Sequence, residues 1–269
     1  MRSIMLAIQF LTILPVRLRG VVSERDIARS AAFFPVVGAV QGFLLFISAI
    51  ALVRLLPPDI VSGFLIALAI ISNGGFHLDG LADTFDALAV KSSGDPAADR
   101  EKRLSVMKDS LTGAIGVVAI VMVILLKFVL IKNVLIFPVP LAGFLILFLM
   151  PVFSKWIMVP AMYHGKSARH NGLGKIFIEG ISLSIVIFSS ALAIFIFSIL
   201  FNLHSAGISG LRTLLIFGLF PAGYLFAHGA VLFCSRKFGG LTGDTLGALS
   251  ELSEIVYLTG SYLWLQHSI

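Results

Sequence analysis

Six long stretches of the chain contain no Asp, Glu, Lys or Arg, and they limit the folds that are open to it. They cover residues 30–53, 60–78, 110–126, 133–154, 180–211 and 213–235. Each is close to or longer than the roughly 17 apolar residues with which a helix crosses the core of a bilayer. Charged residues make up 13% of the chain, whereas a soluble domain has roughly one quarter. We therefore predict an all-α, polytopic membrane protein with six clear transmembrane helices.

The two ends of the chain are predicted to form short helices that are either re-entrant or spanning. Residues 4–16 are apolar, but Arg17 follows where a secretory signal would have a small-residue cleavage site, so we expect this helix to be retained. An amphiphilic helix is expected from about Asp244 to the C-terminus. The length leaves room for a single membrane domain, residues 1–269.

The charges between the apolar stretches predict an orientation. If the stretches alternate, one face carries 15 of the 20 Lys and Arg and 13 of the 14 acids, in loops 17–29, 77–109, 155–179 and 236–254. The positive-inside rule makes this face cytoplasmic. Lys155 then begins a cytoplasmic loop, and Lys127 belongs to a turn on the opposite face. The positive charges are dispersed among short loops, which favours the lipid bilayer over nucleic acid as a partner; a homo-oligomer stays open.

An acidic stretch at residues 73–90, NGGFHLDGLADTFDALAV, is the most informative motif. On a helix, Asp79, Asp83 and Asp86 fall at i, i+4 and i+7, within one stripe. Like charges one turn apart repel each other, and Mg²⁺ typically binds one or two carboxylates together with substrate phosphates. We predict a Mg²⁺ site here, with His77 as a catalytic base or a structural neighbour. An ordinary acidic helix face in water is the alternative.

A second acidic motif, FGGLTGDTLGALSELSE, occupies residues 238–254. Asp244 and Glu251 are seven residues apart and therefore share a helix face. Thr242 and the glycines before Asp244 suit a helix N-terminus, which favours anions. We predict that Asp244 and Glu251 hold a second metal ion and that the two acidic helices face one another across one site. A capped interfacial helix with acids in water is the alternative.

Basic residues lie between the two acidic motifs, in REKRLSVMKDSLTGAIG at 100–116. Carboxylates for Mg²⁺ and basic side chains for phosphate oxygens are the usual combination for phosphoryl transfer. Such cations serve equally as anchors to anionic lipid. The residues that we predict to bind the substrate's phosphates are Lys102, Arg103, Lys108 and the adjoining Asp109.

These motifs resemble those of the cobalamin synthase family, the adenosylcobinamide-GDP ribazoletransferases. GGFHLDGLADTFDAL and GLTGDTLGALSELSE carry most of the resemblance, supported by FLTILP, FFPVVGAVQG and RLSVMKDSLTGAIG. The resemblance implies a multi-pass enzyme of the prokaryotic inner membrane with its active site facing the cytoplasm. It also implies that the enzyme joins a GDP-activated corrinoid to α-ribazole or α-ribazole 5′-phosphate, releases GMP and requires Mg²⁺.

Two other functional classes stay open. A CDP-alcohol phosphotransferase-like enzyme also uses clustered Asp residues on membrane helices, but its pattern has an Arg shortly after the first acids. Here no Arg follows Asp79 before Arg100, so the match is poor. A permease or cation channel would instead have its acids within the bilayer core, along a continuous path.

Overall fold

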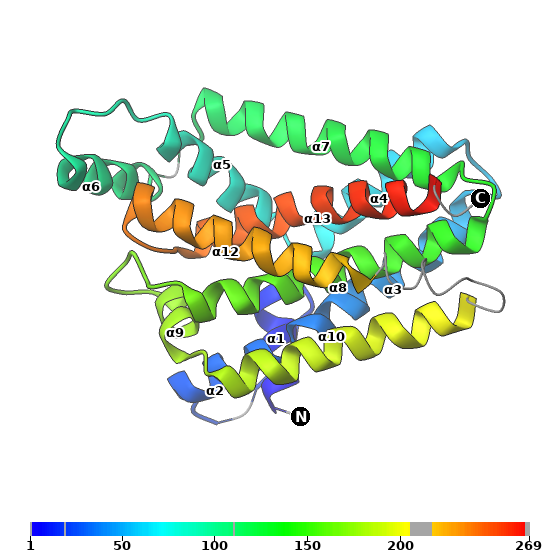
Figure 1. Ribbon diagram of the computed structural model, residues 1–269, viewed down its shortest axis with the longest axis horizontal. Helices are drawn as coiled ribbons and strands as arrows, with labels where there is room; N and C mark the ends of the chain where they lie inside the picture. The colour runs from blue at the N-terminus through cyan, green and yellow to red at the C-terminus, as the bar shows by residue number, and fades with distance from the viewer. Residues whose placement is uncertain (1, 19, 110, 205–216, 267–269) are drawn as a thin grey trace.

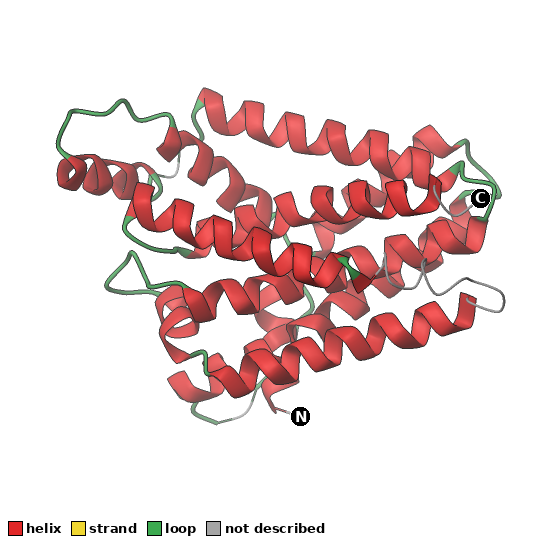
Figure 2. Ribbon diagram, viewed as in Figure 1, coloured by secondary structure: helices red, strands yellow, loops and turns green. Residues whose placement is uncertain are grey.

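The computed structural model describes residues 2–18, 20–109, 111–204 and 217–266, and within these ranges it is helical with no strand (Figures 1 and 2). A single isolated bridge joins Ser167 to Leu241 among these residues. The elements are α1 (Arg2–Leu11), α2 (Glu24–Ser30), η1 (Ala31–Phe33), α3 (Phe34–Leu52), α4 (Pro58–Ser72), α5 (Phe76–Leu88), α6 (Pro96–Val106), α7 (Ala114–Leu135), α8 (Pro140–His164), α9 (Leu173–Gly180), α10 (Leu183–His204), α12 (Leu219–Phe238) and α13 (Gly243–Gln266).

Several of these helices are long and apolar enough to cross a membrane. Four segments of the described chain qualify, namely Glu24–Leu52, α7, α8 and the part of α10 up to Leu200. The pair α4 and α5 qualifies as a fifth if it is taken as one broken span. The polytopic helical fold is thus confirmed, whereas the count of six spans is not. The expected span at 213–235 corresponds to α12, which does not meet the same criteria, and part of it lies outside the described residues.

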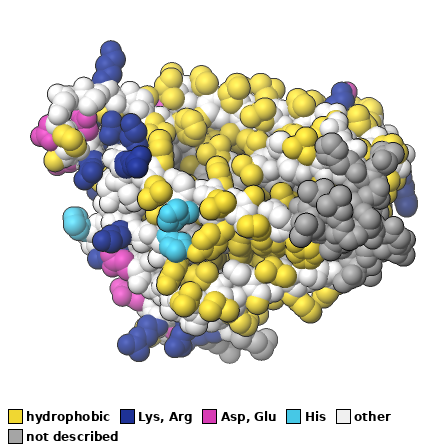
Figure 3. All heavy atoms as spheres, viewed as in Figure 1, with side chains coloured by type: hydrophobic (Ala, Val, Ile, Leu, Met, Phe, Trp, Pro, Cys, Tyr) yellow, Lys and Arg dark blue, Asp and Glu magenta, His cyan; other side chains and the backbone are white. Residues whose placement is uncertain are grey.

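The helices form a bundle around α8 and α13 (Figure 1). α8 packs against α3, α10, α12 and α13, and 89% of its apolar segment is buried. α7 and α10 lie at the outside, with only 28% of theirs buried, as expected for helices that face lipid. Figure 3 shows charged side chains gathered mainly at the end that carries α2, α6 and α9, with hydrophobic side chains over the helices beyond it.

The chain bends by 89° between α4 and α5, where the sequence predicted one continuous span over 60–78. Gly74 and Gly75 have φ angles of +67° and +75°, a left-handed conformation that side chains with a Cβ seldom adopt. The side chain of Asn73 accepts a hydrogen bond from the backbone N–H of Gly75 at 2.9 Å. The bend redirects the acidic helix α5 into the bundle, alongside α13 and α7.

The two chain ends differ from one another. α1 has 10 residues, about 15 Å of helix, which is too short to span a bilayer. This outcome confirms a short N-terminal helix. The helix expected from about Asp244 onward is confirmed as α13, but it is not short: it has 24 residues and packs against α5, α7, α8 and α12.

Two lysines that were expected outside the apolar helices lie within them. Lys127 belongs to α7 rather than to a turn, and Lys155 belongs to α8 rather than to a polar loop. Both are buried because acidic side chains of α13 meet them inside the bundle. One cation is thereby lost from each predicted face, so the excess of positive charge on one side remains.

Candidate functional site

The acidic helices α5 and α13 are packed closely against each other. A Cβ placed on Gly80 would lie 2.7 Å from the backbone oxygen of Asp244, and one on Gly247 would lie 3.2 Å from the Cα of His77. Small residues at such positions let two helix backbones approach. Position 77 is opposite 247 and position 80 is opposite 244, so the two helices run antiparallel. The expected packing of the two helices against each other is confirmed, whereas a single site shared between them stays a prediction.

Three carboxylates act on one another through their charges where the two helices meet, and we call Asp79, Asp83 and Asp244 the acidic site. Asp83 lies in the field of the like charges of Asp79, Asp244 and Asp86, and Asp79 also acts on Asp244. Asp79 is exposed, whereas Asp83 and Asp244 are half-buried. Mutual repulsion of this kind is relieved by a cation.

Arg169 provides such a cation. Its Nη2 donates a hydrogen bond to Oδ2 of Asp244 at 2.6 Å and another to the backbone oxygen of Met107 at 3.3 Å. Its charge also acts on Asp83. The Nε of Arg169 is buried and has no hydrogen-bond partner among the described residues. The guanidinium therefore lies at the acidic site with its buried Nε donor unused.

The loop that carries Arg169 is fixed to the start of α13. The backbone N–H of Ala168 donates to the carbonyl of Leu241 at 2.8 Å, and the N–H of Leu241 donates to the carbonyl of Lys166 at 2.7 Å. Arg169 was not predicted as a site residue, because it is 75 residues away from Asp244 along the chain. Its only signal was its position in a basic, glycine-rich loop on the same predicted face.

Two cavities with basic walls flank this loop. One, of about 870 Å³, is lined by Arg169, Arg100 and Lys108, with Glu101 as its acidic residue. The other, of about 570 Å³, lies between α2 and α9. The basic residues that line the second cavity are Arg25, Arg29 and Lys175, its acidic residues are Glu24 and Glu179, and His170 lines both cavities.

Of the four residues predicted to bind phosphate, only Lys108 lines the larger cavity. Arg103 is 9% exposed, and its Nη1 donates to the backbone oxygen of Lys237 at 3.1 Å, which ties α6 to the end of α12. Lys102 is exposed and does not line the cavity. The carboxylate of Asp109 accepts a hydrogen bond from the backbone of Leu111 at 3.1 Å.

α6, which carries Arg100, is preceded by a loop that Asp99 holds in place. The Asp99 carboxylate accepts hydrogen bonds from the hydroxyl of Ser92 at 2.5 Å and from the backbone and hydroxyl of Ser93 at 2.7 and 2.8 Å. These hydrogen bonds lower the pKa of Asp99 from 3.8 to about 2. Asp99 thus stays ionised and keeps one wall of the larger cavity in position.

The carboxylate of Asp86 binds the N-terminus of α7. Its two carboxylate oxygens accept hydrogen bonds from the backbone N–H groups of Gly113 and Gly116, at 2.6 and 2.7 Å. These N–H groups have no partner within the helix, and the helix dipole favours an anion there. Both glycines leave room for the carboxylate, because a Cβ on either would lie within 2.5 Å of it. Asp86 therefore caps α7 from α5 and contacts the acidic site only through its charge.

Glu251 and His77 are buried away from the acidic site. Glu251 is 2% exposed and forms an ion pair with Lys127, Nζ to Oε2, at 2.5 Å. It is seven residues after Asp244, about 10 Å along the helix. His77 is 5% exposed, and its Nδ1 lies 3.3 Å from Nζ of Lys155 and 3.4 Å from Nδ2 of Asn73. The structure therefore does not bring Glu251 together with Asp244 or place His77 among the acids.

The acidic site has the chemistry of a shared rather than a complete metal site. Nowhere in the described chain do three His, Cys, Asp or Glu side chains gather closely enough to hold a metal ion by themselves. Mg²⁺ usually takes one or two carboxylates and completes its coordination with water and phosphate oxygens. The carboxylates of Asp79, Asp83 and Asp244 are such hard oxygen donors, and Gly80 lets the backbone that carries Asp244 approach α5 closely. These residues fit a Mg²⁺ ion that is held jointly with a substrate.

Comparisons with known proteins cover nearly the whole chain. The family model described as cobalamin-5-phosphate synthase matches residues 3–262. An adenosylcobinamide-GDP ribazoletransferase of Thermodesulfovibrio yellowstonii is 37% identical over 98% of both chains. Relatives of the same name from Desulfitobacterium hafniense and Geotalea daltonii are 34% and 35% identical, over 97% and 96% of both chains. No solved structure matches the chain.

Proposed function

The chain belongs to the cobalamin-5-phosphate synthase family, and we propose that it transfers the phosphocobinamide group of adenosylcobinamide-GDP to α-ribazole or α-ribazole 5′-phosphate, releasing GMP. The observation that carries this proposal is the convergence of Asp79, Asp83 and Asp244 with Arg169 beside a basic cavity. Acids that hold a cation and basic groups that hold phosphate oxygens are what phosphoryl transfer requires.

The reaction exchanges one bond to phosphorus for another. An oxygen of the ribazole hydroxyl bonds to the phosphorus next to cobinamide, the bond from that phosphorus to the bridging oxygen breaks, and GMP leaves with that oxygen. Asp79, Asp83 and Asp244 would hold Mg²⁺, which, when bound, neutralises negative charge on the diphosphate and on the departing GMP. The hydroxyl proton would pass to a carboxylate of this group that is not engaged with the ion.

Arg169 is proposed to exchange partners when substrate binds. With Asp244 engaged in holding the cation, the guanidinium of Arg169 would be free to turn to the substrate, and its planar fork suits phosphate oxygens. The larger cavity, lined by Arg100 and Lys108, would hold the GDP part of the substrate. The smaller basic cavity, on the other side of the loop, would suit a second anionic substrate such as α-ribazole 5′-phosphate.

We further propose that the protein lies in the inner membrane with its acidic site on the cytoplasmic side. The support is the concentration of Lys and Arg at the end of the molecule that carries the acidic site and both basic cavities (Figure 3). This orientation obeys the positive-inside rule and places the site in the compartment of GDP-activated substrates. The buried charges in the bundle do not favour a permease, because the cavity beside them has a volume of only about 20 Å³, room for about one water.

The test is an assay with the purified protein in lipid nanodiscs. Adenosylcobinamide-GDP, α-ribazole 5′-phosphate and Mg²⁺ are supplied, and GMP and the corrinoid product are quantified. We expect turnover that stops when EDTA is added and resumes when Mg²⁺ is restored. Absence of GMP release at saturating substrates and Mg²⁺ would overturn the proposed function, and EDTA-resistant turnover would overturn the metal requirement.

A further inference from the structure

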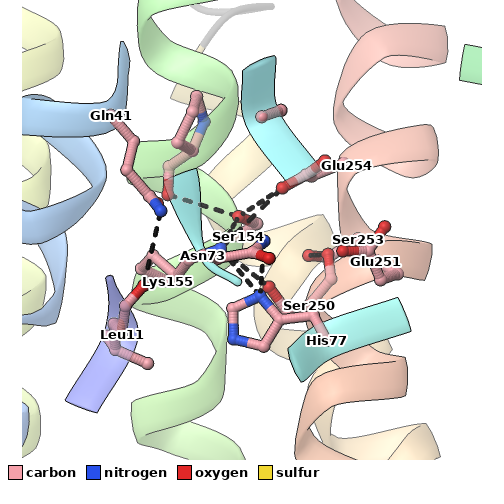
Figure 4. A network of polar contacts seen from close by, with 12 residues as sticks. Leu11, Gln41, Asn73, His77, Ser154, Lys155, Ser250, Glu251, Ser253 and Glu254 are labelled. Carbon is pink, nitrogen blue, oxygen red and sulfur yellow. Dashed lines mark hydrogen bonds and ion pairs between the residues drawn. The ribbon is translucent and has the colours of Figure 1, made fainter. Parts of the chain in front are cut away.

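Four charged side chains are buried together in the bundle, apart from the acidic site. Lys127 comes from α7, Lys155 from α8, and Glu251 and Glu254 from α13, and each is at most 6% exposed. Figure 4 shows Lys155 between Glu254, Ser250 and His77, where α5, α8 and α13 meet. Two cations and two anions give this buried cluster no net charge, which is the condition under which charges are tolerated in an apolar interior.

The two lysines of the buried cluster have different partners. Lys127 contacts both glutamates, at 2.5 and 2.6 Å. Lys155 is 3.9 Å from Glu254, and its closer contacts are with uncharged acceptors. Its Nζ lies 3.1 Å from Oγ of Ser250, 3.2 Å from Oγ of Ser154 and 3.3 Å from Nδ1 of His77. These acceptors account for the three protons of the ammonium, so Lys155 joins α5 and α13 to α8.

The contact between Lys155 and His77 lies close to the acidic site along α5. Lys155 and Asn73 are both donors, so Nδ1 of His77 accepts and the neutral ring carries its proton on Nε2. His77 is in the first turn of α5, directly after the bend, and two residues before Asp79. On the other helix, Ser250 is six residues after Asp244. Lys155 thus holds α5 and α13 just beyond the place where the acidic site forms.

We propose that Lys155 is a positioning residue for the transfer reaction, which sets the register of α5 against α13 through His77 and Ser250 and thereby the spacing of Asp79 and Asp83 from Asp244. The proposal rests on the proposed function. The helices meet at Gly80 and Gly247, and small residues alone offer little resistance to sliding. A buried ammonium resists it, because any register that removes its acceptors leaves donors unpaired in an apolar interior.

The kinetic test uses Lys155→Met combined with Glu254→Gln, so that the buried cluster keeps no net charge, and compares it with the unsubstituted enzyme. We expect kcat to fall about tenfold or more from misplacement of the acids, while KM for both substrates stays within about twofold because their binding cavities are elsewhere. His77→Leu added to the Lys155 variant should cause little further loss, since both changes remove one link. If the losses in kcat caused by the Lys155 variant and by His77→Leu multiply when the two are combined, the proposal is overturned.

A matched control removes the other ammonium of the buried cluster. Lys127→Met with Glu251→Gln is also neutral, but Lys127 bonds to α13 rather than to α5. We expect its effect on kcat to multiply with that of His77→Leu, because the two act independently. If Lys127 and Lys155 variants couple equally to His77, the cluster acts as general packing and the specific role of Lys155 fails.

A distance measurement provides a readout that does not require turnover. In a Cys234→Ser background, spin labels are attached to Ala89→Cys at the end of α5 and Thr259→Cys on α13, both exposed positions outside the acidic site. The distribution of label–label distances should shift or broaden with Lys155→Met/Glu254→Gln but not with the equally neutral Lys127→Met/Glu251→Gln. An unchanged distribution in a variant of low kcat would overturn the proposal. If the unsubstituted enzyme releases no GMP, the proposed function fails, whereas the distances still test the register.

Discussion

At the scale of single residues, Asp83 and Asp86 are one helical turn apart but have different surroundings. Asp83 is crowded by like charges, whereas both oxygens of Asp86 accept backbone hydrogen bonds from α7. Asp83→Asn should therefore abolish GMP release without lowering stability, since it removes repulsion. Asp86→Asn places an amide N–H₂ opposite backbone donors and should lower the free energy of unfolding by about 1–3 kcal/mol.

Thermal unfolding and GMP release, measured on the same preparations, separate these two roles. Wild-type turnover in Asp83→Asn at saturating Mg²⁺ would remove Asp83 from the metal site. If the Asp86→Asn protein is stable but inactive, Asp86 is instead a residue of the metal site.

The proposed competition between Arg169 and a metal ion for Asp244 makes an unusual combination of effects testable. Arg169→Gln should bind Mn²⁺, used as a spectroscopic substitute for Mg²⁺, more tightly, because the ion pair at 2.6 Å no longer has to be broken. The same variant should lose about 100-fold in kcat/KM, since a group that stabilises the transferring phosphate is gone. Lys166→Gln, an exposed change in the same loop, is the control. Unchanged Mn²⁺ affinity would contradict the competition.

Residue types and spacing identified the acids, but not their partners. Helical periodicity is local, so the stripe of Asp79, Asp83 and Asp86 was visible in the sequence. The backbone N–H groups of Gly113 and Gly116, which donate hydrogen bonds to Asp86, are 27 and 30 residues away along the chain. Lys127, which pairs with Glu251, is 124 residues away from it. Such contacts depend on how the helices pack, and no spacing rule provides them.

At the scale of elements, the bend before α5 determines where the acids are placed. Gly75 has a φ of +75° and open space around its Cα, so Gly75→Ala adds strain without a clash, at a cost of about 1–2 kcal/mol. We expect kcat to fall beyond what this loss of stability explains, because α5 begins at the next residue.

Gly63→Ala in α4 is the matched control for the bend. A Cβ at Gly63 also meets nothing within 4 Å, but its φ is not positive, and replacing Gly by Ala within a helix stabilises it by about 1 kcal/mol. Activity and thermal unfolding are measured for Gly75→Ala and Gly63→Ala, and only Gly75→Ala should lose activity. Full activity in Gly75→Ala would show that the bend is not what positions the acids.

The predicted helix limits were wrong where they depended on a glycine or a lysine whose surroundings in the fold are not visible in the sequence. Residues 60–78 read as one span because hydropathy does not record a positive φ at Gly74. Lys127 and Lys155 read as loop residues because an isolated ammonium is excluded from a bilayer core. They are inside because Glu251 and Glu254, which come later in the chain, neutralise them.

At the scale of the whole molecule, charge predicts which end of the bundle faces the cytoplasm. Single cysteines in a Cys234→Ser background should react with an impermeant reagent from outside the cell at positions 59 and 133, but not at 95 or 166. Asp59 lies with Lys132 in an ion pair at 2.6 Å, at the end away from the acidic site. Ser205, a further position expected outside, is beyond the described residues. Outside labelling at 95 or 166 would invert the orientation.

The whole fold also decides which distant acids act as one unit. The chain returns after α12 so that α13 lies antiparallel to α5, and the backbone of Asp244 then contacts Gly80, three residues from Asp83. Residues that hold one ion together lose function together, so their substitutions are far from additive. Asp83→Asn with Asp244→Asn should lose little more activity than the worse single variant.

Glu251 provides the contrast, because the sequence assigned it to the same site and the structure places it in the buried cluster with Lys127. Glu251→Gln should lower thermal stability, since it leaves that cluster with an unbalanced positive charge. Its effect on activity should therefore multiply with that of Asp83→Asn, as expected for separate sites. If Glu251→Gln instead behaves as Asp244→Asn does in combination with Asp83→Asn, then Glu251 belongs to the metal site, and the ion pair with Lys127 must break when metal and substrate bind.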